Sequence, residues 1–463
     1  MPRLPGFCGG AYQGRSITAD AQRCLNLFPE QSLEKNQLVL IGTPGISLFA
    51  TLSDSPVRCF HLTRGRLFVV SGGTLYELSS DGTATVRGTV SRSGHASITS
   101  NGVELFITTG GGAYIYTLET NLLSAPNIPG KAMGAFVDGY FVGLQGASQQ
   151  VWLSGLYDGA AWDGLDFTSA EGNPDLAKHI LPDHRELVIF GEESTEFFYN
   201  SGDPDMPIWP NRGAFVEQGI GAPWSAVKMD NSIFMIGGGS RGAGIAWRFV
   251  GYQPQRISTH PVEAAWASYS TISDAVGYAY EDEGHSFWVI WFPTIDKTWC
   301  YDAATGLWHE RGWWDKVHAT MNAHRSSCHI YAFGQHLVGD RENGNVYTQS
   351  LDTYTDNGDE LRRIRVTPHL AIENKRIYNS LLEVHAEVGV GLSTGQGSDP
   401  QMMMRHSDDG GKTWSNERWA PLGKIGQYKN RCRWHRLGSG RDRVYEISCS
   451  EPTKQVWIDA YIE

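Results

Sequence analysis

A short apolar strand, a glycine-rich or polar turn and a second apolar strand recur along most of this 463-residue chain. The two most similar copies are residues 67–78 and 105–118, and looser copies begin at residues 140, 187, 233, 287 and 330. Successive copies start about 44 residues apart on average, which is the length of one four-stranded propeller blade. A pair of β-sandwiches would not need similar hairpins at a nearly constant interval.

The repeat predicts an all-β fold with a β-propeller of six or seven blades over residues 46–365. The number of blades stays open because tryptophan-rich insertions near Trp162 and Trp209 obscure the period. Residues 366–463 change to a simple alternation of apolar and polar positions, which predicts a smaller C-terminal antiparallel β-domain. Residues 1–45 hold turn residues and few periodic apolar positions, so we expect an N-terminal arm there.

Charge divides the chain into two parts. Residues 361–463 carry 16 Lys and Arg against 12 Asp and Glu, whereas the preceding 360 residues carry 22 against 38. Sequence-independent binding to nucleic acid comes from cations that neutralise phosphates, so the acidic body is not a general nucleic-acid binder. It would instead suit the wall of a conduit along which DNA slides.

The cysteines and the apolar runs indicate in which cellular compartment the chain folds. Seven cysteines are scattered without a C-x-x-C pair, which predicts reduced, mostly buried thiols. The longest apolar run, residues 287–292, is far shorter than a membrane helix requires. Because no secretory signal is visible either, we expect the chain to fold in the cytoplasm of the cell that makes it.

Residues 407–414 match the pattern S-x-D-x-G-x-T-W of an Asp-box hairpin. In such a hairpin the Ser and Asp side chains bond turn amides, a glycine takes a positive φ and the tryptophan anchors the turn in a core. A single copy outside the propeller argues against a sialidase, in which several boxes decorate the blades. We therefore predict a structural Asp-box formed by Ser407, Asp409, Gly411, Thr413 and Trp414.

No motif defines a catalytic centre, a cofactor site or a metal site. The G-x-G-x-x-G pattern at residues 237–242 is followed by a strand-like segment, whereas a dinucleotide site needs a helix there. His318, His324, Cys328 and His329 lie close in sequence but lack the second ligand pair of a tetrahedral site. We predict a protein that is not an enzyme and binds no metal or cofactor.

Two kinds of segment are candidate interfaces. Exposed tryptophans mark binding surfaces, although the same side chains would equally well fill the space between blades. Alternation along a strand puts Arg431, Arg433 and His435 on one face and Cys432, Trp434 and Arg436 on the other. The basic cluster is either a docking face for an acidic partner or a solvated face. The candidate interface residues are Trp209, Arg212, Trp308, Trp313, Trp314, Lys424, Lys429, Arg431, Arg433, Arg436, Arg441 and Arg443.

The two ends of the chain resemble a known family. Residues 405–414, 423–428, 433–438 and 441–447, together with Asn26-Leu-Phe-Pro-Glu and the Pro-Gly turn that follows it, are similar to the tail nozzle, tail hub or packaged-DNA stabilisation proteins of short-tailed bacteriophages. The resemblance implies a homo-oligomeric ring, expected to be a hexamer, below the portal and its adaptor. Such a ring continues the DNA channel, retains packaged DNA, carries a tail needle, fibres or tailspikes, and opens for ejection. It would place the protein in the virion tail.

Two other functions remain open from the residues. The aromatic content and the Asp-box would suit a propeller that binds or cleaves glycans in receptor recognition. A third hypothesis is a cytoplasmic scaffolding propeller of cellular origin, and the resemblance of the two chain ends to phage proteins argues against it. Binding or hydrolysis of host surface polysaccharide by a monomer would distinguish the glycan function from the ring.

Overall fold

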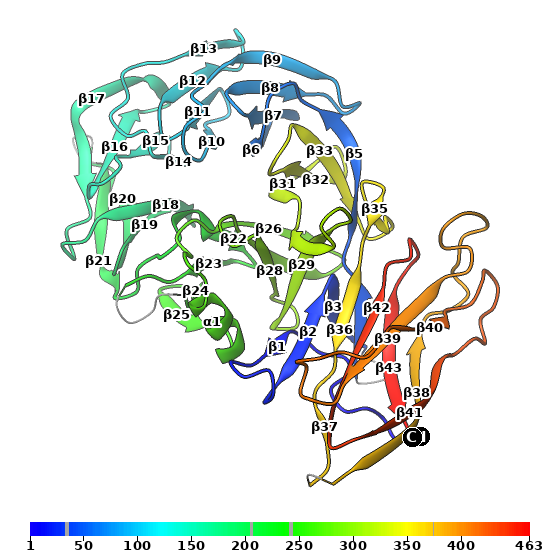
Figure 1. The fold of residues 1–463 in the computed structure, drawn as a ribbon. Helices are drawn as coiled ribbons and strands as arrows, with labels where there is room; N and C mark the ends of the chain where they lie inside the picture. The colour runs from blue at the N-terminus through cyan, green and yellow to red at the C-terminus, as the bar shows by residue number, and fades with distance from the viewer. Residues whose placement is uncertain (33–36, 204–206, 240–243, 374) are drawn as a thin grey trace.

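Seven four-stranded antiparallel blades form a ring in the computed structural model, and a β-sandwich is attached at one side (Figure 1). Five blades are separate sheets, and the other two are parts of a 12-stranded and a 6-stranded sheet. This confirms the predicted all-β class and resolves the number of blades as seven. The structure describes residues 1–32, 37–203, 207–239, 244–373 and 375–463.

The first four blades follow one another along the chain, each running from an inner strand to an outer one. They are β6–β9 (Val57–Thr63, Arg66–Ser71, Thr74–Leu78, Ala84–Thr89), β10–β13 (Ser97–Ser100, Glu104–Thr108, Ala113–Thr117, Leu122–Ser124), β14–β17 (Met133–Val137, Tyr140–Leu144, Gln150–Gly155, Asp158–Ser169) and β18–β21 (Ala177–Asp183, Glu186–Gly191, Thr195–Asn200, Ile208–Val216).

Blades five to seven complete the ring, and the short helices η1 (Pro223–Ser225) and α1 (His260–Ala267) flank blade five. No described helix is long and apolar enough to cross a membrane. The strands are β22–β25 (Val227–Met229, Ser232–Ile236, Ala246–Val250, Gln253–Arg256), β26–β29 (Val276–Asp282, His285–Phe292, Lys297–Asp302, Leu307–Asp315) and β31–β33 (Ser326–Ala332, Gln335–Asp340, Asn345–Ser350), which β5 (Gly45–Thr51) joins.

The hairpins that repeat in the sequence are the second and third strands of the blades. Those beginning at residues 67 and 105, for example, are β7–β8 and β11–β12. The copy assigned to residue 330 is one strand out of phase, because it begins inside β31, the innermost strand of blade seven. The insertions around Trp162 and Trp209 lie in the long outer strands β17 and β21, where extra residues do not disturb the ring.

A strand from the start of the chain closes the propeller. β5 pairs antiparallel with β33 over residues 45–51, so blade seven combines segments about 300 residues apart in sequence. Separating the first and last blades therefore requires breaking a complete strand pairing.

The sandwich packs two sheets, and residues before 45 supply strands to both. One sheet runs β3-β4-β43-β38-β41, and the other runs β2-β36-β42-β39-β40. The segment expected to be an arm thus forms strands of both sheets: β2 lies between β29 and β36, β4 pairs with β43, and β3 is an edge strand. The remaining strands are β1 (Tyr12–Gln13), β2 (Ala21–Leu25), β3 (Leu27–Ser32), β4 (Gln37–Gly42), β30 (Thr320–Ala323), β34 (Thr355–Asp356), β35 (Asp359–Glu360), β36 (Arg363–Val366), β37 (Leu370–Ala371), β38 (Ile377–Ala386), β39 (Gln401–Ser407), β40 (Arg418–Pro421), β41 (Cys432–Gly440), β42 (Asp442–Cys449) and β43 (Val456–Ile462).

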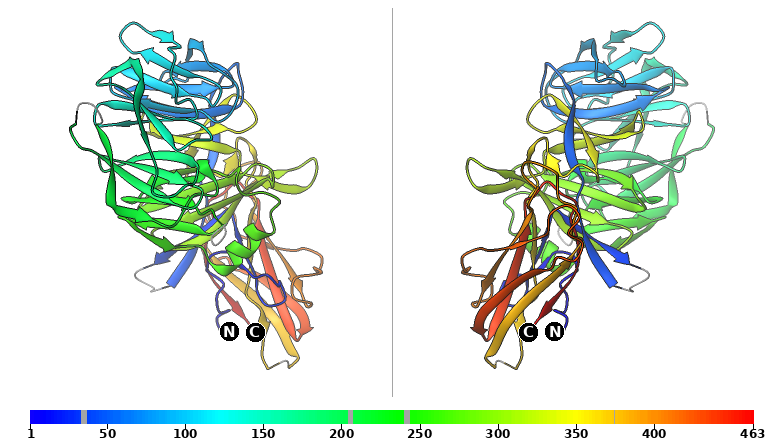
Figure 2. Two further views of the ribbon diagram at one scale, coloured as in Figure 1. Left: turned by 90° about the vertical axis from the view of Figure 1, so that its left-hand side faces the viewer. Right: turned by 90° about the vertical axis from the view of Figure 1, so that its right-hand side faces the viewer.

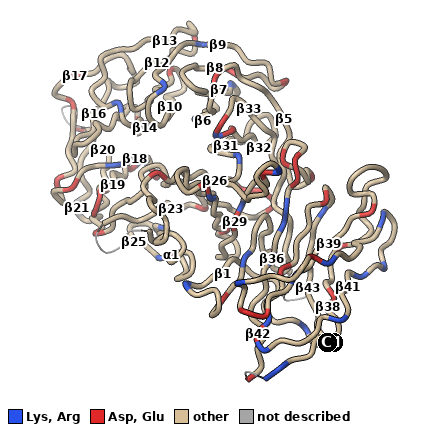
Figure 3. Tube along the Cα trace, viewed as in Figure 1, with Lys and Arg blue, Asp and Glu red and all other residues tan. Residues whose placement is uncertain are grey.

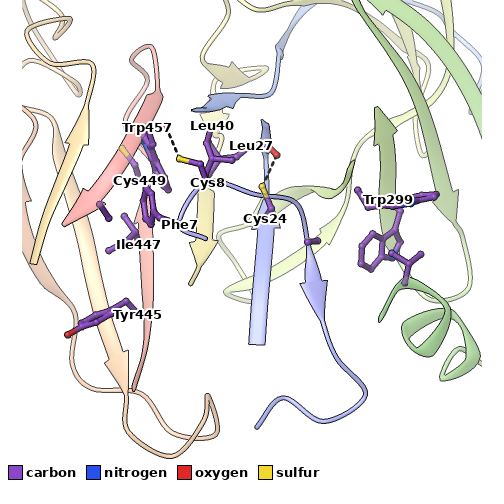
Figure 4. Packing of buried hydrophobic residues seen from close by; sticks show 14 of the residues in the cluster. Phe7, Cys8, Cys24, Leu27, Leu40, Trp299, Tyr445, Ile447, Cys449 and Trp457 are labelled. Carbon is purple, nitrogen blue, oxygen red and sulfur yellow. Dashed lines mark hydrogen bonds between the residues drawn. The ribbon is translucent and has the colours of Figure 1, made fainter. Parts of the chain in front are cut away.

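The propeller and the sandwich share one sheet and one hydrophobic core. β2 pairs with β29 of blade six on one side and with β36 of the sandwich on the other. A single buried cluster extends from Trp299 and Trp308 in blade six, through N-terminal side chains such as Phe7, to Tyr445 and Trp457 in the sandwich (Figure 4). The two chain ends lie side by side at the far end of the sandwich (Figure 2), where the Ile462 amide donates to the Pro2 carbonyl at 3.0 Å.

Candidate interaction surfaces

The Asp-box residues bond to one another at the end of β39. Ser407 Oγ donates to Asp409 Oδ1 at 2.7 Å and accepts from the Gly411 amide at 2.8 Å. The Thr413 hydroxyl and amide donate to the same carboxylate, and these bonds hold the pKa of Asp409 well below its usual range. Trp414 packs against a cluster that includes β2 and β36 side chains, so the box anchors its turn next to the N-terminal strands.

The tryptophans divide between core and surface. Trp308 is 1 % exposed and its indole donates to the Ile257 carbonyl at 3.0 Å, so it fills the core and offers no surface. Trp313 and Trp314 are half-buried beneath the guanidinium groups of Arg325 and Arg362. Trp209 in β21 is 36 % exposed. The Arg212 side chain lies outside the described residues.

The predicted alternation along β41 holds from Arg431 to His435. Arg431 and Arg433 are exposed on one face, and Cys432 and Trp434 are buried on the other. Arg436 departs from the pattern: its φ is 58°, the register against β38 shifts beside it, and its side chain is exposed. A bulge of this kind inserts one residue and turns its side chain to the outer face.

Ion pairs occupy part of the basic cluster. Arg431 and Arg433 bind the two oxygens of the buried Glu383 carboxylate at 2.9 and 2.7 Å, so one positive charge remains uncompensated. Lys424 lies 3.5 Å from Asp399, and both side chains are more than half exposed. Lys429 and Arg441 are exposed as well.

Arg443 is the clear exception in this cluster. Its side chain is 2 % exposed, and its guanidinium donates to both Asp408 carboxylate oxygens, at 2.6 and 2.7 Å. A third bond goes to the Leu437 carbonyl at 2.7 Å. Arg443 therefore joins the Asp-box turn to β41 and β42 and does not belong to the candidate interface.

The domain junction is built around Asn26, which links β2 to β3. This residue is fully buried with φ at 52°. Its Nδ2 donates to the Gly312 carbonyl in blade six and to the Arg362 carbonyl before β36, both at 2.8 Å. Its Oδ1 accepts from the Gly312 amide at 2.9 Å. One side chain thus joins the propeller, the sandwich and the N-terminal segment.

A bidentate ion pair strengthens the same junction. Arg23 in β2 binds Glu310 in β29 at 2.9 and 2.8 Å. Although burial favours the neutral acid, the Arg23 charge keeps the pKa of Glu310 below its ordinary value. Bidentate pairing fixes geometry as well as charge, so the relative orientation of the two domains is specified by side chains as well as by β-pairing.

The histidines and cysteines considered as metal ligands are dispersed. His318 bonds Asp315 at the tip of the β29–β30 hairpin, His324 bonds Ser326, and His329 faces His336 across β31 and β32. Among the described residues no group of three or more His, Cys, Asp or Glu side chains could hold a metal ion. All seven cysteines are unpaired, five of them buried and two half-buried.

Asp356 is a buried acid between the propeller and the sandwich. Its carboxylate is 1 % exposed and has no hydrogen-bond partner among the described residues. Burial raises its pKa to about 7, against the opposing charges of Arg363 and Arg325 and together with the charge of Asp359. The folded protein therefore retains a proton that the unfolded chain releases near pH 4.

Replacing Asp356 with asparagine should remove one contribution to the pH dependence of stability. Because the folded-state pKa of Asp356 is raised, the contribution of this side chain to stability falls as the pH increases from about 4 to about 7 and is constant above, with a slope of at most about 1.4 kcal/mol per pH unit. The D356N variant lacks this slope. Urea unfolding of both proteins at pH 4.5, 6 and 8 measures the difference, and parallel profiles would contradict the assignment.

The side chains described above bind mainly to each other and across the domain junction. Two family comparisons match the sequence, one described as "Bacteriophage P22 Gp10, beta-propeller" over residues 21–354 and one as "Bacteriophage P22 Gp10, beta-sandwich" over residues 362–463. The chain belongs to this family of bacteriophage structural tail proteins. The resemblance of its two ends to tail nozzle or stabilisation proteins is confirmed.

Other comparisons show only distant similarity. A search of curated proteins found no match. Among solved structures, the extracellular domain of the putative hybrid two-component system BT4673 from B. thetaiotaomicron aligns with a TM-score of 0.44 and 9 % identity over 70 % of this chain and 45 % of that one. YCF48 from Cyanidioschyzon merolae aligns with a TM-score of 0.42 and 12 % identity over 66 % and 98 %. Similarities of this size carry no argument about the fold or the function of this chain.

Proposed function

We propose that this chain is the subunit of a tail nozzle, a ring below the portal and its adaptor that continues the DNA channel, retains packaged DNA and opens for ejection. The observation that carries the proposal is the match of both domains to the Gp10 family, over nearly the whole chain. The ring is expected to hold six copies and to carry a tail needle, fibres or tailspikes.

The distribution of charge supports a channel component. Residues 1–360, which include the whole propeller, carry 38 acidic and 22 basic side chains. An acidic wall gains no counterion-release free energy from DNA, so a genome can pass it without binding. The role is mechanical rather than catalytic, and the protein belongs to the virion tail.

The rigid junction also fits a part that bears load. A continuous sheet, a shared core, the Arg23–Glu310 pair and the Asn26 bonds tie propeller to sandwich. A subunit built in this way transmits force between its domains instead of hinging freely. Opening for ejection would then occur between subunits.

The test is the mass of the purified 51.2 kDa chain in solution, alone and with portal–adaptor complexes of the same phage. We expect a monomer that adds to the portal–adaptor complex in six copies. A chain that ignores the complex but is retained on host surface polysaccharide would overturn the proposal in favour of a glycan-binding propeller. A bovine serum albumin control of similar mass excludes non-specific capture.

A further inference from the structure

The outer edge of blade three exposes apolar and acidic side chains together. Leu165 is 82 % exposed, Tyr157 63 % and Leu156 59 %, and three carboxylates lie among them. None of the three forms an ion pair with a described residue. We call this surface the blade-three edge; it comprises Leu156, Tyr157, Leu165, Asp158, Asp163 and Asp166.

The blade-three edge is held in a defined shape. β17 pairs with β16 through Asp158 and Trp162 and again from Phe167 onward, so residues 163–166 extend beyond the ladder. Asp163 Oδ1 accepts from the Leu165 amide at 3.0 Å. The Trp162 indole donates to the Gly159 carbonyl at 2.8 Å, which anchors the start of the segment. Leu165 is therefore presented to solvent by an ordered backbone.

A second surface, on the sandwich, has the opposite charge. Tyr428 is 72 % exposed, and Trp419 and Ile425 are each 62 % exposed. Three cations lie beside them, so large apolar and charged groups again alternate over a short segment. We call this surface the β40–β41 loop surface; it comprises Trp419, Ile425, Tyr428, Lys424, Lys429 and Arg431.

This loop is ordered by its own bonds. The Gln427 amide donates to the Lys424 carbonyl at 2.9 Å, and the Lys424 amide donates to Gln427 Oε1 at 3.0 Å. The Gly426 amide donates to the Gly389 carbonyl at 3.1 Å, which ties the loop to the end of β38. Ile425 and Tyr428 thus project from a preformed turn. Preformed apolar groups lose little conformational entropy when they are buried in an interface.

We propose that the β40–β41 loop surface of one copy docks on the blade-three edge of the next copy. The three carboxylates carry no ion pair with a described residue, whereas the loop surface keeps a net positive charge, from Lys429 and from the one charge that Glu383 leaves uncompensated on Arg431 and Arg433. Lys424 would have to exchange its exposed partner Asp399 for the new one. Three exposed apolar side chains of one surface can be buried against three of the other. The proposal rests on the proposed ring and names the contact that closes it.

The location of the two surfaces determines the type of contact. They lie on opposite sides of the molecule, β17 at the left and β40 at the right of Figure 1, so one copy cannot bring its own surfaces together. Figure 3 shows acidic residues along β17 and basic residues on the loops near β39 and β41. A contact between two different surfaces is heterologous, and repeated by rotation it closes into a ring.

The experiment joins the two surfaces covalently. The double variant L165C/I425C is assembled on portal–adaptor complexes and treated with a short bismaleimide. We expect a ladder of linked chains that ends at the closed ring. The native thiols are buried or half-buried, and burial raises the pKa of Cys59 and Cys328, the two half-buried ones, to about 12, so they react slowly. The matched control V86C/I425C carries its first cysteine on blade one, 61 % exposed, and should give no ladder.

Charge reversal provides an independent readout. D163K/D166K and K424E/K429E should each weaken ring assembly at least about tenfold, and the chain carrying all four changes should recover most of the loss. Assembly of six copies without 165–425 links would overturn the docking proposal and leave the ring intact. Links from the thiol introduced by I425C to the portal, adaptor or another protein would assign this loop to a different partner and overturn it as well. Failure of the unmodified chain to assemble would overturn the ring and, with it, this contact.

Discussion

Replacing Asn26 with alanine should lower the free energy of unfolding by about 5 kcal/mol. The change removes three buried hydrogen bonds and leaves the Gly312 amide and the Gly312 and Arg362 carbonyls unsatisfied, at about 1–3 kcal/mol for each group. Alanine also has to adopt the φ of 52°, which costs about 1 kcal/mol more than for asparagine. Urea unfolding followed by tryptophan fluorescence measures the loss.

Asn26→Gly separates the two contributions. Glycine accepts the left-handed backbone without strain, so it should retain about 1 kcal/mol relative to alanine while losing the same three bonds. A loss below about 1 kcal/mol in both variants would mean that the junction does not depend on this side chain. Equal losses in the two variants would show that the positive φ of residue 26 contributes nothing to the difference, and the contribution of the three hydrogen bonds would stand.

The propeller could be predicted because the sequence pattern that defines each blade lies within one short segment of the chain. Each blade carries the same hairpin, and adjacent strands of a hairpin pair through short turns, as in β7–β8 and β11–β12. Blade seven shows the limit: its outer strand, β5, lies at the other end of the chain, so no local pattern links it to β33. The copy that begins at residue 330 lies in β31, the first strand of this blade, whereas the other copies begin at second strands.

The N-terminal strands were missed because they lack alternation. β2 lies between β29 and β36, and β3 is an edge strand whose first three residues are buried and whose last three are half-buried or exposed, so neither burial pattern repeats every second residue. Sequence periodicity detects half-buried strands well and fully enclosed ones poorly. Asn26 was noticed only as part of a family resemblance, although a positive φ and three buried bonds explain why asparagine is placed there.

The basic part of the candidate interface was predicted from a local cluster of Lys and Arg, and such a cluster does not distinguish exposed from buried arginine. Arg431 and Arg433 do lie on the exposed face of β41, as alternation predicts. Arg443 is buried, and its carboxylate partner is Asp408. Because the two residues are 35 positions apart in sequence, no local pattern reveals the pair. The exposed apolar groups Leu165 and Tyr428 were missed because a single apolar residue in a polar segment carries no periodic signal.

Arg365 is the second residue on which the N-terminal region depends. It is fully buried in β36, where its guanidinium donates to the Gly6, Phe7, Gly10 and Arg23 carbonyls and to Gln22 Oε1, at 2.6 to 3.2 Å. Burial lowers its pKa, since none of these acceptors carries a charge. The five bonds satisfy a cation entirely with neutral oxygens and fold residues 6–23 around it.

Arg365→Met should therefore cost about 4–6 kcal/mol, because four buried carbonyls lose their donor while the volume of the side chain is nearly kept. Arg365→Lys should recover little of this loss, since one ammonium cannot reach acceptors that a planar, forked group reaches together. Hydrogen exchange should accelerate over residues 4–13 in both variants, and limited proteolysis should cleave there. The exposed Arg376→Met serves as the control, with an expected change within about 0.5 kcal/mol.

A variant R365M that unfolds like the wild type, with residues 4–13 still protected, would show that strand pairing and the Phe7 core contact hold the N-terminus without the cation. If R365M loses hydrogen-exchange protection only at residues 4–13 and the unfolding transition of the propeller is unchanged, Arg365 and the domain junction have separate roles. The guanidinium would then secure the N-terminal segment to the sandwich, while Asn26 and the Arg23–Glu310 pair secure the sandwich to the propeller. Under the ring proposal, the second outcome predicts subunits that still assemble but whose sandwich domains deform under load.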